Sequence, residues 1–330
     1  MRIVSLLPSA TEIVCALGAE AELVGISHEC DHPERVRDRE VLTRSRIAAE
    51  GSSRAIDARV REALVTGALS IYAVDDEKLA RLAPDVIVTQ DLCEVCAVSL
   101  DDVRSAVARL SKRSDVRIVS LRPTRLRDVF GDVERVAEAI GRVEAGRALR
   151  RDLEARVARI AERARDAPRR PRVVSIEWID PIMLGGTWMP ELIELAGGVA
   201  AGVTAGAAAP TVSPEELAAL RPDVIVVKPC GFSVERTLRE RDLVERVIVA
   251  SAPGARTYVA DGNAFFNRPG PRLVESLEIM AACVHPEIFG DLAIDGPHRP
   301  PGQLDPRAQQ PHGHVPAVTN PDGTPWLRIK

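Results

Sequence analysis

The sequence is poor in aromatic residues, which make up 3% of its 330 residues. It has no run of about 18 apolar residues, so we expect no transmembrane helix. It also lacks a basic excess, since 44 Lys and Arg stand against 48 Asp and Glu. Nucleic-acid binders carry clustered positive charge. We therefore expect no nucleic-acid partner.

The sequence also has no sign of a disulfide scaffold or of an export signal. Six cysteines in a chain of this length are too few for a disulfide scaffold, so we expect thiols or metal ligands. The first residues predict a strand, without the basic region, apolar run and cleavage site of a signal peptide. These two observations favour a cytoplasmic protein.

Short apolar runs alternate with helical patterns along most of the chain. Continuous Val and Ile runs separated by helices are typical of parallel strands in α/β units. The expected strands are Ile3–Leu7, Leu23–Ile26, Ser70–Tyr72, Val86–Thr89, Arg117–Leu121, Val173–Ile176, Val224–Val227 and Thr257–Val259. The sequence therefore predicts an α/β fold with mainly parallel sheets.

The two halves of the chain repeat one another. Arg2-Ile-Val-Ser5 matches Arg172-Val-Val-Ser175, and Leu82-Ala-Pro-Asp-Val-Ile-Val88 matches Leu220-Arg-Pro-Asp-Val-Ile-Val226. The spacing between the matches differs, which indicates a diverged duplication. We expect two similar lobes.

A helical segment separates these halves, and a Pro-rich segment follows them. Apolar residues at helical spacing predict one long helix from about Val143 to Ala167, ended by Pro168. The predicted divisions are a first lobe (1–122), a helical linker (123–168), a second lobe (169–292) and an extended tail (293–330).

Residues that directly follow the strands are the candidates for ligand binding, because ligands of parallel sheets bind at the carboxyl ends of the strands. In the first lobe these residues are polar: Ser9, Thr11, Tyr72, Gln90 and Asp91. In the second lobe they are an acid and five aromatics: Glu177, Trp178, Trp188, Phe232, Phe265 and Phe266.

Several of these residues have a second interpretation. Ser9 and Thr11 precede a predicted helix and are also suited to capping it. Arg268 and Arg272 flank a rigid turn, where they are suited to grip a carboxylate or phosphate, or to form surface salt bridges.

Cys93-Glu-Val-Cys96 is the clearest local motif. Two thiolates at this spacing can bind Zn²⁺ or part of an iron–sulfur cluster. The missing ligands would come from His28 and Cys30, or from Cys230 of the other lobe. A redox dithiol and unreactive thiols are the alternatives.

Four features together resemble a known family. They are Ile3-Val-Ser-Leu-Leu-Pro-Ser-Ala-Thr-Glu-Ile13, the repeated Pro-Asp-Val-Ile-Val, the long helix and Arg268-Pro-Gly-Pro-Arg272. Over about residues 1–290 the chain resembles the cobalamin- and iron-siderophore-type substrate-binding proteins of ABC transporters, in their cytoplasmic-type branch. The resemblance implies two Rossmann-like lobes, one rigid connecting helix and a ligand held in a cleft between the lobes.

We therefore expect a binding protein that clamps a cobalamin-like corrinoid or another metal chelate, and we favour this over an enzyme. The alternative is a cytoplasmic metalloenzyme or metal carrier that uses Zn, Fe or an Fe–S cluster in the same cleft. The resemblance also implies the permease of an ABC transporter as a partner. The missing signal peptide argues against that partner.

Overall fold

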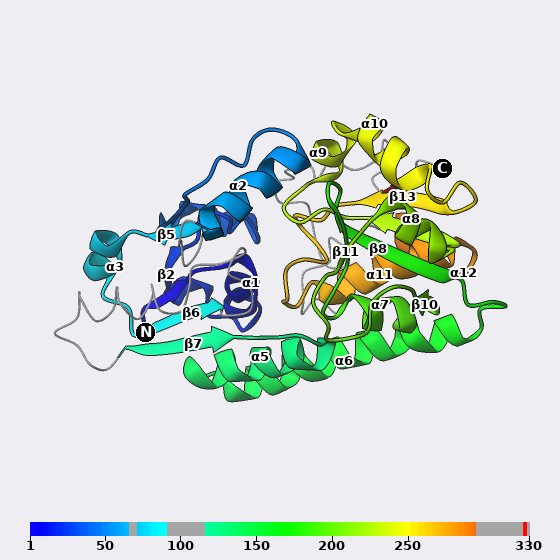
Figure 1. Ribbon diagram of the computed structural model, residues 1–330. Coiled ribbons are helices and arrows are strands. Elements are labelled where there is room, and N and C mark those ends of the chain that lie inside the picture. Colours follow the sequence, from blue (N-terminus) through cyan, green and yellow to red (C-terminus); the bar gives the residue numbers. More distant parts are fainter. Residues whose placement is uncertain (66–70, 91–115, 295–325, 329–330) are drawn as a thin grey trace. The chain divides into compact units, whose positions relative to one another are not determined.

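The computed structural model describes residues 1–65, 71–90, 116–294 and 326–328, which fall into two compact units (Figure 1). The first unit comprises Met1–Leu153 and Pro269–Pro271, and the second comprises Glu154–Arg268 and Arg272–Lys330. The first unit contains a parallel sheet and the second a mixed sheet, both with helices, so the predicted α/β fold class is confirmed. The cleft and the four-part division of the chain stay predictions.

A five-stranded parallel sheet forms the centre of the first unit. Its strand order is β3-β2-β1-β6-β7, and a separate antiparallel pair joins β4 and β5. The strands are β1 (Ile3–Ser5), β2 (Leu23–Ile26), β3 (Glu40–Val41), β4 (Thr43–Ser45), β5 (Tyr72–Val74), β6 (Val86–Gln90) and β7 (Arg117–Leu121). The helices are α1 (Pro8–Ala16), α2 (Ser53–Val65), α3 (Asp76–Leu82), α5 (Leu126–Ala139) and the first part of α6 (Val143–Arg165).

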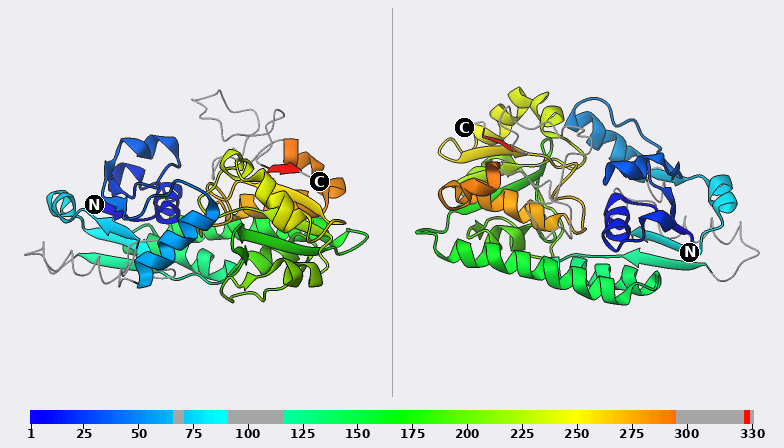
Figure 2. Two further views of the ribbon diagram at one scale, coloured as in Figure 1. Left: turned by 45° about the horizontal axis from the view of Figure 1, so that its top comes forward. Right: turned by 180° about the vertical axis from the view of Figure 1, so that it is seen from behind.

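The second unit has a mixed sheet in the order β11-β9-β8-β12-β13-β14, with β10 paired to β8. Its strands are β8 (Arg172–Trp178), β9 (Ile182–Leu184), β10 (Val199–Ala200), β11 (Thr211–Val212), β12 (Val224–Val227), β13 (Arg256–Ala260) and β14 (Trp326–Arg328). Its helices are α7 (Met189–Leu195), α8 (Pro214–Ala219), α9 (Val234–Leu238), α10 (Arg241–Val244), α11 (Leu273–Val284) and α12 (Pro286–Ile294). Both views of Figure 2 show the short red β14 beside β13, with which it pairs antiparallel.

The sequence repeat has a structural equivalent in backbone contacts. In the first unit the backbone N–H of Arg2 donates to Asp85 Oδ2 at 2.8 Å. In the second, the backbone N–H of Arg172 donates to Asp223 Oδ2 at 2.7 Å. In each case the arginine Nε also donates to the carbonyl three residues before that Asp, at 2.6 Å and 3.0 Å respectively. The repeated Arg and Pro-Asp therefore set the same strand pairing in both units.

Seven of the eight expected strands are present in parallel pairing, whereas the one expected at Ser70–Tyr72 corresponds to β5, which pairs antiparallel with β4. The bounds expected for β2, β7 and β12 agree with the structure, whereas β5 begins at Tyr72 where a strand was expected from Ser70. β4, β9, β11 and β14 are antiparallel additions of two or three residues. Strands this short contain too little alternation to be recognised from sequence.

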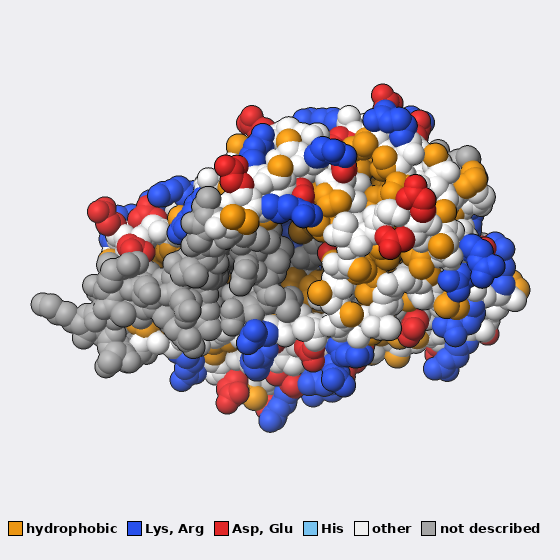
Figure 3. Space-filling model, in the orientation of Figure 1, with side chains coloured by type: hydrophobic (Ala, Val, Ile, Leu, Met, Phe, Trp, Pro, Cys, Tyr) orange, Lys and Arg blue, Asp and Glu red, His pale blue; other side chains and the backbone are white. Residues whose placement is uncertain are grey.

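The long helix is confirmed as α6, which ends at Arg165 and crosses from the first unit to the second at Leu153–Glu154. Within the second unit, Arg156 fastens it to α11 through ion pairs with Glu275 at 3.1 Å and Glu278 at 3.0 Å. No helix in the described part of the chain is both long and apolar enough to span a membrane. Figure 3 shows basic and acidic side chains interspersed over the face that it displays.

Candidate functional site

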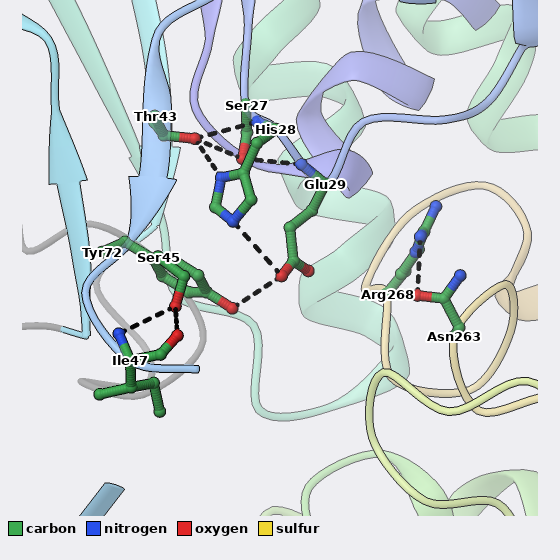
Figure 4. Close-up of polar contacts among 9 residues, drawn as sticks. All are labelled: Ser27, His28, Glu29, Thr43, Ser45, Ile47, Tyr72, Asn263 and Arg268. Carbon is green, nitrogen blue, oxygen red and sulfur yellow. Dashed lines mark hydrogen bonds and ion pairs between the residues drawn. The ribbon is translucent and has the colours of Figure 1, made fainter. Parts of the chain in front are cut away.

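A cluster of polar side chains lies at the carboxyl end of β2 in the first unit (Figure 4). We call Ser27, His28, Glu29, Thr43 and Tyr72 the His28 cluster. The Tyr72 hydroxyl donates to Glu29 Oε1 at 2.9 Å, and the His28 and Tyr72 rings meet edge to face with centroids 5.1 Å apart. The antiparallel pair β4–β5 supplies Thr43 and Tyr72, so two short strands that are distant in sequence complete an edge that β2 begins.

The hydrogen bonds of Thr43 determine which ring nitrogen of His28 carries the proton. The Thr43 hydroxyl has a single proton and donates it to Ser27 Oγ at 2.9 Å. It also lies 2.6 Å from His28 Nδ1, and so must accept a proton from that nitrogen. The neutral imidazole therefore has its proton on Nδ1 and its lone pair on Nε2.

The environment of His28 keeps this lone pair available. Burial lowers the pKa of the imidazole, and the nearby Glu29 carboxylate opposes that shift. The side chain is still 27% exposed. Nε2 lies 3.7 Å from Glu29 Oε1, which is too long for a hydrogen bond, and has no such partner among the described residues. The ring therefore presents an electron pair to solvent beside a carboxylate oxygen.

The predicted ligand contacts at the start of α1 are buried in the structure. The helix begins at Pro8, so Ser9 and Thr11 lie within its first turn and neither is the N-cap. Thr11 donates to Ser5 Oγ at 2.8 Å and lies 3.0 Å from Cys30 Sγ. Because the Thr11 proton is given to Ser5, the Cys30 thiol donates and keeps its own proton. A metal-bound thiolate would have lost that proton.

Two predicted ligand-binding residues of the first lobe and three predicted metal ligands remain. Of the ligand-binding residues, Gln90 is buried and Asp91 lies outside the described residues. The metal-ligand candidates Cys93 and Cys96 also lie outside the described residues. Cys230 is an exposed free cysteine of the second unit. In the part of the chain that the structure describes, no group of three or more His, Cys, Asp or Glu side chains is placed to hold a metal ion. The cysteine-based metal site stays a prediction.

The carboxyl-end edge of the second sheet carries a stack of side chains. Trp178 is half-buried and packs on Phe232, with ring centroids 5.1 Å apart. The Arg236 guanidinium lies over the Phe232 ring at 4.0 Å. Phe232 is therefore covered, and Trp178 is the aromatic of this stack that retains exposed surface.

The other predicted aromatics pack inside the second unit. Trp188 is 6% exposed and its indole N–H donates to the Phe266 carbonyl at 2.8 Å. Phe266 has no exposed surface, and Phe265 is 4% exposed. Their position after strands suggested a wall open to a ligand, but in this conformation they stabilise the loops that follow β9 and β13.

A buried lysine lies at the same edge, directly after β12. Lys228 is fully buried, and its Nζ lies 2.8 Å from Asn267 Oδ1 and 3.4 Å from Glu177 Oε2. Burial lowers the pKa of this ammonium, while the Glu177 carboxylate acts in the opposite direction. Glu177 is 27% exposed. Of this pair, only the carboxylate reaches the surface.

Both predicted arginines make local contacts. Arg268 is 7% exposed, and its guanidinium donates to Asn263 Oδ1 at 3.2 Å, as Figure 4 shows. Arg272 is half-buried and lies over the Phe265 ring at 5.4 Å. Their proposed grip on an anion stays a prediction.

Sequence reasoning missed Thr43 and Lys228. Thr43 lies in a strand too short to be recognised, and nothing in the sequence links it to His28. Lys228 did carry a signal, because a charged residue ends the apolar run Val224–Val227.

The sequence model of one family, described as periplasmic binding protein, matches residues 3–257. None of the curated proteins compared with the chain matches it. Three similar solved structures have low sequence identity and show the fold alone.

The periplasmic heme-binding protein RhuT from Roseiflexus sp. RS-1 has a TM-score of 0.64 at 21% identity, covering 86% of this chain and 98% of that chain. The periplasmic vitamin B12 binding protein BtuF of Vibrio cholerae has a TM-score of 0.62 at 19% identity, with coverages of 86% and 96%. An ABC transporter substrate-binding protein from Listeria monocytogenes EGD-e has a TM-score of 0.63 at 18% identity, with coverages of 86% and 98%.

These comparisons overturn one expectation. The matching family and two of these structures are described as periplasmic, so the predicted cytoplasmic location is wrong. The missing signal peptide did not justify the expected cytoplasmic location, because where a given sequence begins does not decide where the protein works.

Proposed function

The chain belongs to the periplasmic binding protein family, and from that premise we propose that it binds a metal chelate, with His28 contacting the metal. By a metal chelate we mean a metal ion already enclosed by an organic ligand. Two similar structures support this class, since one is a heme-binding protein and the other a vitamin B12 binding protein. Within this class we propose a cobalamin-like corrinoid, because the sequence resembles cobalamin-type substrate-binding proteins.

The observation that carries the proposal is the oriented Nε2 of His28, which has no hydrogen-bond partner among the described residues. A free metal ion takes about four protein ligands or more, whereas a chelated metal has one or two open positions. The His28 cluster offers one imidazole nitrogen, with the Glu29 carboxylate and Tyr72 hydroxyl beside it. The hydrogen bond of Nδ1 to Thr43 is the kind of outer contact that orients a metal-ligating histidine. The cluster therefore suits a metal that arrives already chelated.

The partner that follows from this function is the permease of an ABC transporter. One of the similar structures is an ABC transporter substrate-binding protein. No observation on the described residues favours the alternative of a Zn or Fe–S protein. That alternative depends on Cys93 and Cys96, which lie outside the described residues.

Titration of the full chain with heme, vitamin B12 and free Fe³⁺ tests the proposal. We expect a chelate to bind and free Fe³⁺ not to bind at the same concentration. His28→Gln should weaken binding of the chelate by about tenfold or more and shift its absorption spectrum, since a direct ligand to the metal is lost.

His32→Gln is the matched control, because His32 is an exposed histidine of the same loop. Binding that is equally weakened by both variants, or unaffected by His28→Gln, would contradict the assignment of His28. Binding of free Fe³⁺ in preference to both chelates would contradict the ligand class.

A further inference from the structure

Glu177 at the carboxyl end of β8 is held by two donors that approach the same oxygen. Lys228 Nζ lies 3.4 Å from Glu177 Oε2, and the backbone N–H of Gly186 donates to that oxygen at 3.2 Å. Oε1 has no hydrogen-bond partner within the described ranges of the chain. The carboxylate is therefore fixed at one oxygen and open at the other.

Both donors are themselves fixed by the surrounding loops. At Gly186 an added Cβ would lie 2.5 Å from the Ala209 nitrogen and 2.8 Å from the Ala207 oxygen, so only glycine allows this approach. The next residue, Thr187, donates from its backbone N–H to the Ala207 carbonyl at 2.7 Å. The N–H that reaches Glu177 is thus part of a closely packed turn.

Lys228 is held by Asn267, whose side chain joins two loops. Asn267 Oδ1 accepts from Lys228 Nζ at 2.8 Å, while its Nδ2 donates to the Gly262 carbonyl at 2.8 Å. The ammonium therefore has little freedom to leave Glu177.

The exposure of this pair is unequal. Lys228 has no exposed surface, whereas 27% of the Glu177 side chain is exposed. A carboxylate serving only to neutralise a buried ammonium would be expected to be buried with it, because burial strengthens the pair. Glu177 instead presents an oriented acceptor at the edge where ligands of parallel sheets bind.

We propose that Glu177 is a specificity-determining residue that selects chelates with hydroxyl or carboxamide donors on their periphery over chelates with carboxylates. An ionised carboxylate is an acceptor only, so Oε1 accepts from a hydroxyl or amide but opposes another carboxylate. Lys228 and Gly186 act as positioning groups. This inference rests on the proposed function.

Vitamin B12 and heme serve as probes, since the periphery of the first carries carboxamides and that of the second carries carboxylates. We expect the full wild-type chain to bind vitamin B12 about tenfold more tightly than heme, as measured by calorimetry.

Glu177→Gln reverses the polarity of the open position. Because Lys228 and Gly186 both donate, the glutamine must turn its oxygen toward them and its NH₂ toward the ligand. A carboxamide both donates and accepts and so tolerates this reversal, whereas a carboxylate gains a donor. The variant should therefore tighten heme binding more than vitamin B12 binding and reduce their affinity ratio by about fivefold or more. Glu194→Gln, at an exposed acid on α7, is the matched control and should leave the ratio unchanged.

A second measurement needs no variant and so does not depend on one folding. Wild-type protein should bind a vitamin B12 derivative, with its carboxamides hydrolysed to carboxylates, about fivefold or more weakly than the parent.

The outcomes separate the two proposals. If neither chelate binds, the proposed function fails and this inference fails with it. If a chelate binds but Glu177→Gln and the hydrolysed derivative leave affinities unchanged, or if the wild type prefers heme, this inference is overturned while the function stands.

Discussion

The strand-end edges of the two units differ in chemistry although their sheets share the same internal repeat. The first presents Nε2 of His28, and Thr43 keeps the ring proton on the other nitrogen, Nδ1. The second presents a carboxylate held by buried Lys228, next to half-buried Trp178. The repeated Arg and Pro-Asp fix the amino ends of the strands alike in both units. The difference teaches that duplication preserved the scaffold, while the loops at the carboxyl ends of the strands became specialised.

Trp188→Ala should have the largest effect, because it tests whether the aromatics of the second edge stabilise the fold or face a ligand. We expect it to lower the free energy of unfolding by about 3–5 kcal/mol, since a buried indole and its hydrogen bond to Phe266 are lost. Trp178→Ala should lower it by about 1 kcal/mol. Urea denaturation measures the free energy of unfolding of both variants. Equal decreases would contradict the argument that the buried Trp188 stabilises the fold more than the half-buried Trp178.

Asp132→Asn tests how the first unit tolerates a buried charge. Burial raises the pKa of Asp132 to about 6, although Arg135 opposes the shift. Its Oδ2 is buried and has no hydrogen-bond partner among the residues that the structure describes. The folded state thus binds more protons than the unfolded state between about pH 4 and 6, and stability falls as the pH rises through that window.

The variant should therefore raise the free energy of unfolding by about 1–2 kcal/mol above pH 6, and the gain should vanish near pH 4. Asp128→Asn in the same helix is the control with opposite sign. Burial raises the pKa of Asp128, but backbone hydrogen bonds from Thr124 and Arg125 outweigh this and lower it overall. Its loss should therefore destabilise the protein at neutral pH. A loss of stability in Asp132→Asn at pH 8 would contradict the burial argument.

Thr11→Val and Ser9→Ala separate two hydroxyls in the first turn of α1. Thr11 is bonded to Ser5 and Cys30, so Thr11→Val should lower the free energy of unfolding by about 1–2 kcal/mol. Ser9 Oγ is buried without a hydrogen-bond partner in the described part of the chain, so Ser9→Ala should be neutral or stabilise by up to about 1 kcal/mol. Thermal denaturation distinguishes the two, and a larger loss in Ser9→Ala would mean that Ser9 has a partner.

Glu29→Gln should have the smallest effect. It tests whether the charge of Glu29 influences the pKa of His28. The Glu29 carboxylate raises the pKa of His28 against the dominant effect of burial. Removing the charge should therefore lower the pKa of His28 further, which NMR titration of the imidazole measures. Glu34→Gln, in the segment Glu34–Asp38, is the control and should leave that pKa unchanged. An upward shift in Glu29→Gln would mean that Glu29 does not act through its charge.

Much of the scaffold was predictable, and the site was predictable only in part. The apolar runs at Val86–Thr89 and Val224–Val227 identified parallel strands, because strands buried on both faces are continuously apolar. Placing candidate residues after the strands found His28 and Glu177, whereas Tyr72 begins β5 and does not follow a strand. The same rule could not separate Trp178 from Trp188, since exposure depends on the loops that pack over each indole.

The sequence by itself determined the α/β class, the internal duplication and the long helix α6, since each follows from local periodicity or repeated residues. Only the tertiary structure decided which nitrogen of His28 carries the proton, because that depends on Thr43 in a different strand. It also decided that one oxygen of Glu177 is held in place, because Lys228 and Gly186 reach it from separate loops. Hydrogen bonds between residues distant in sequence set these properties, and no local pattern encodes their geometry.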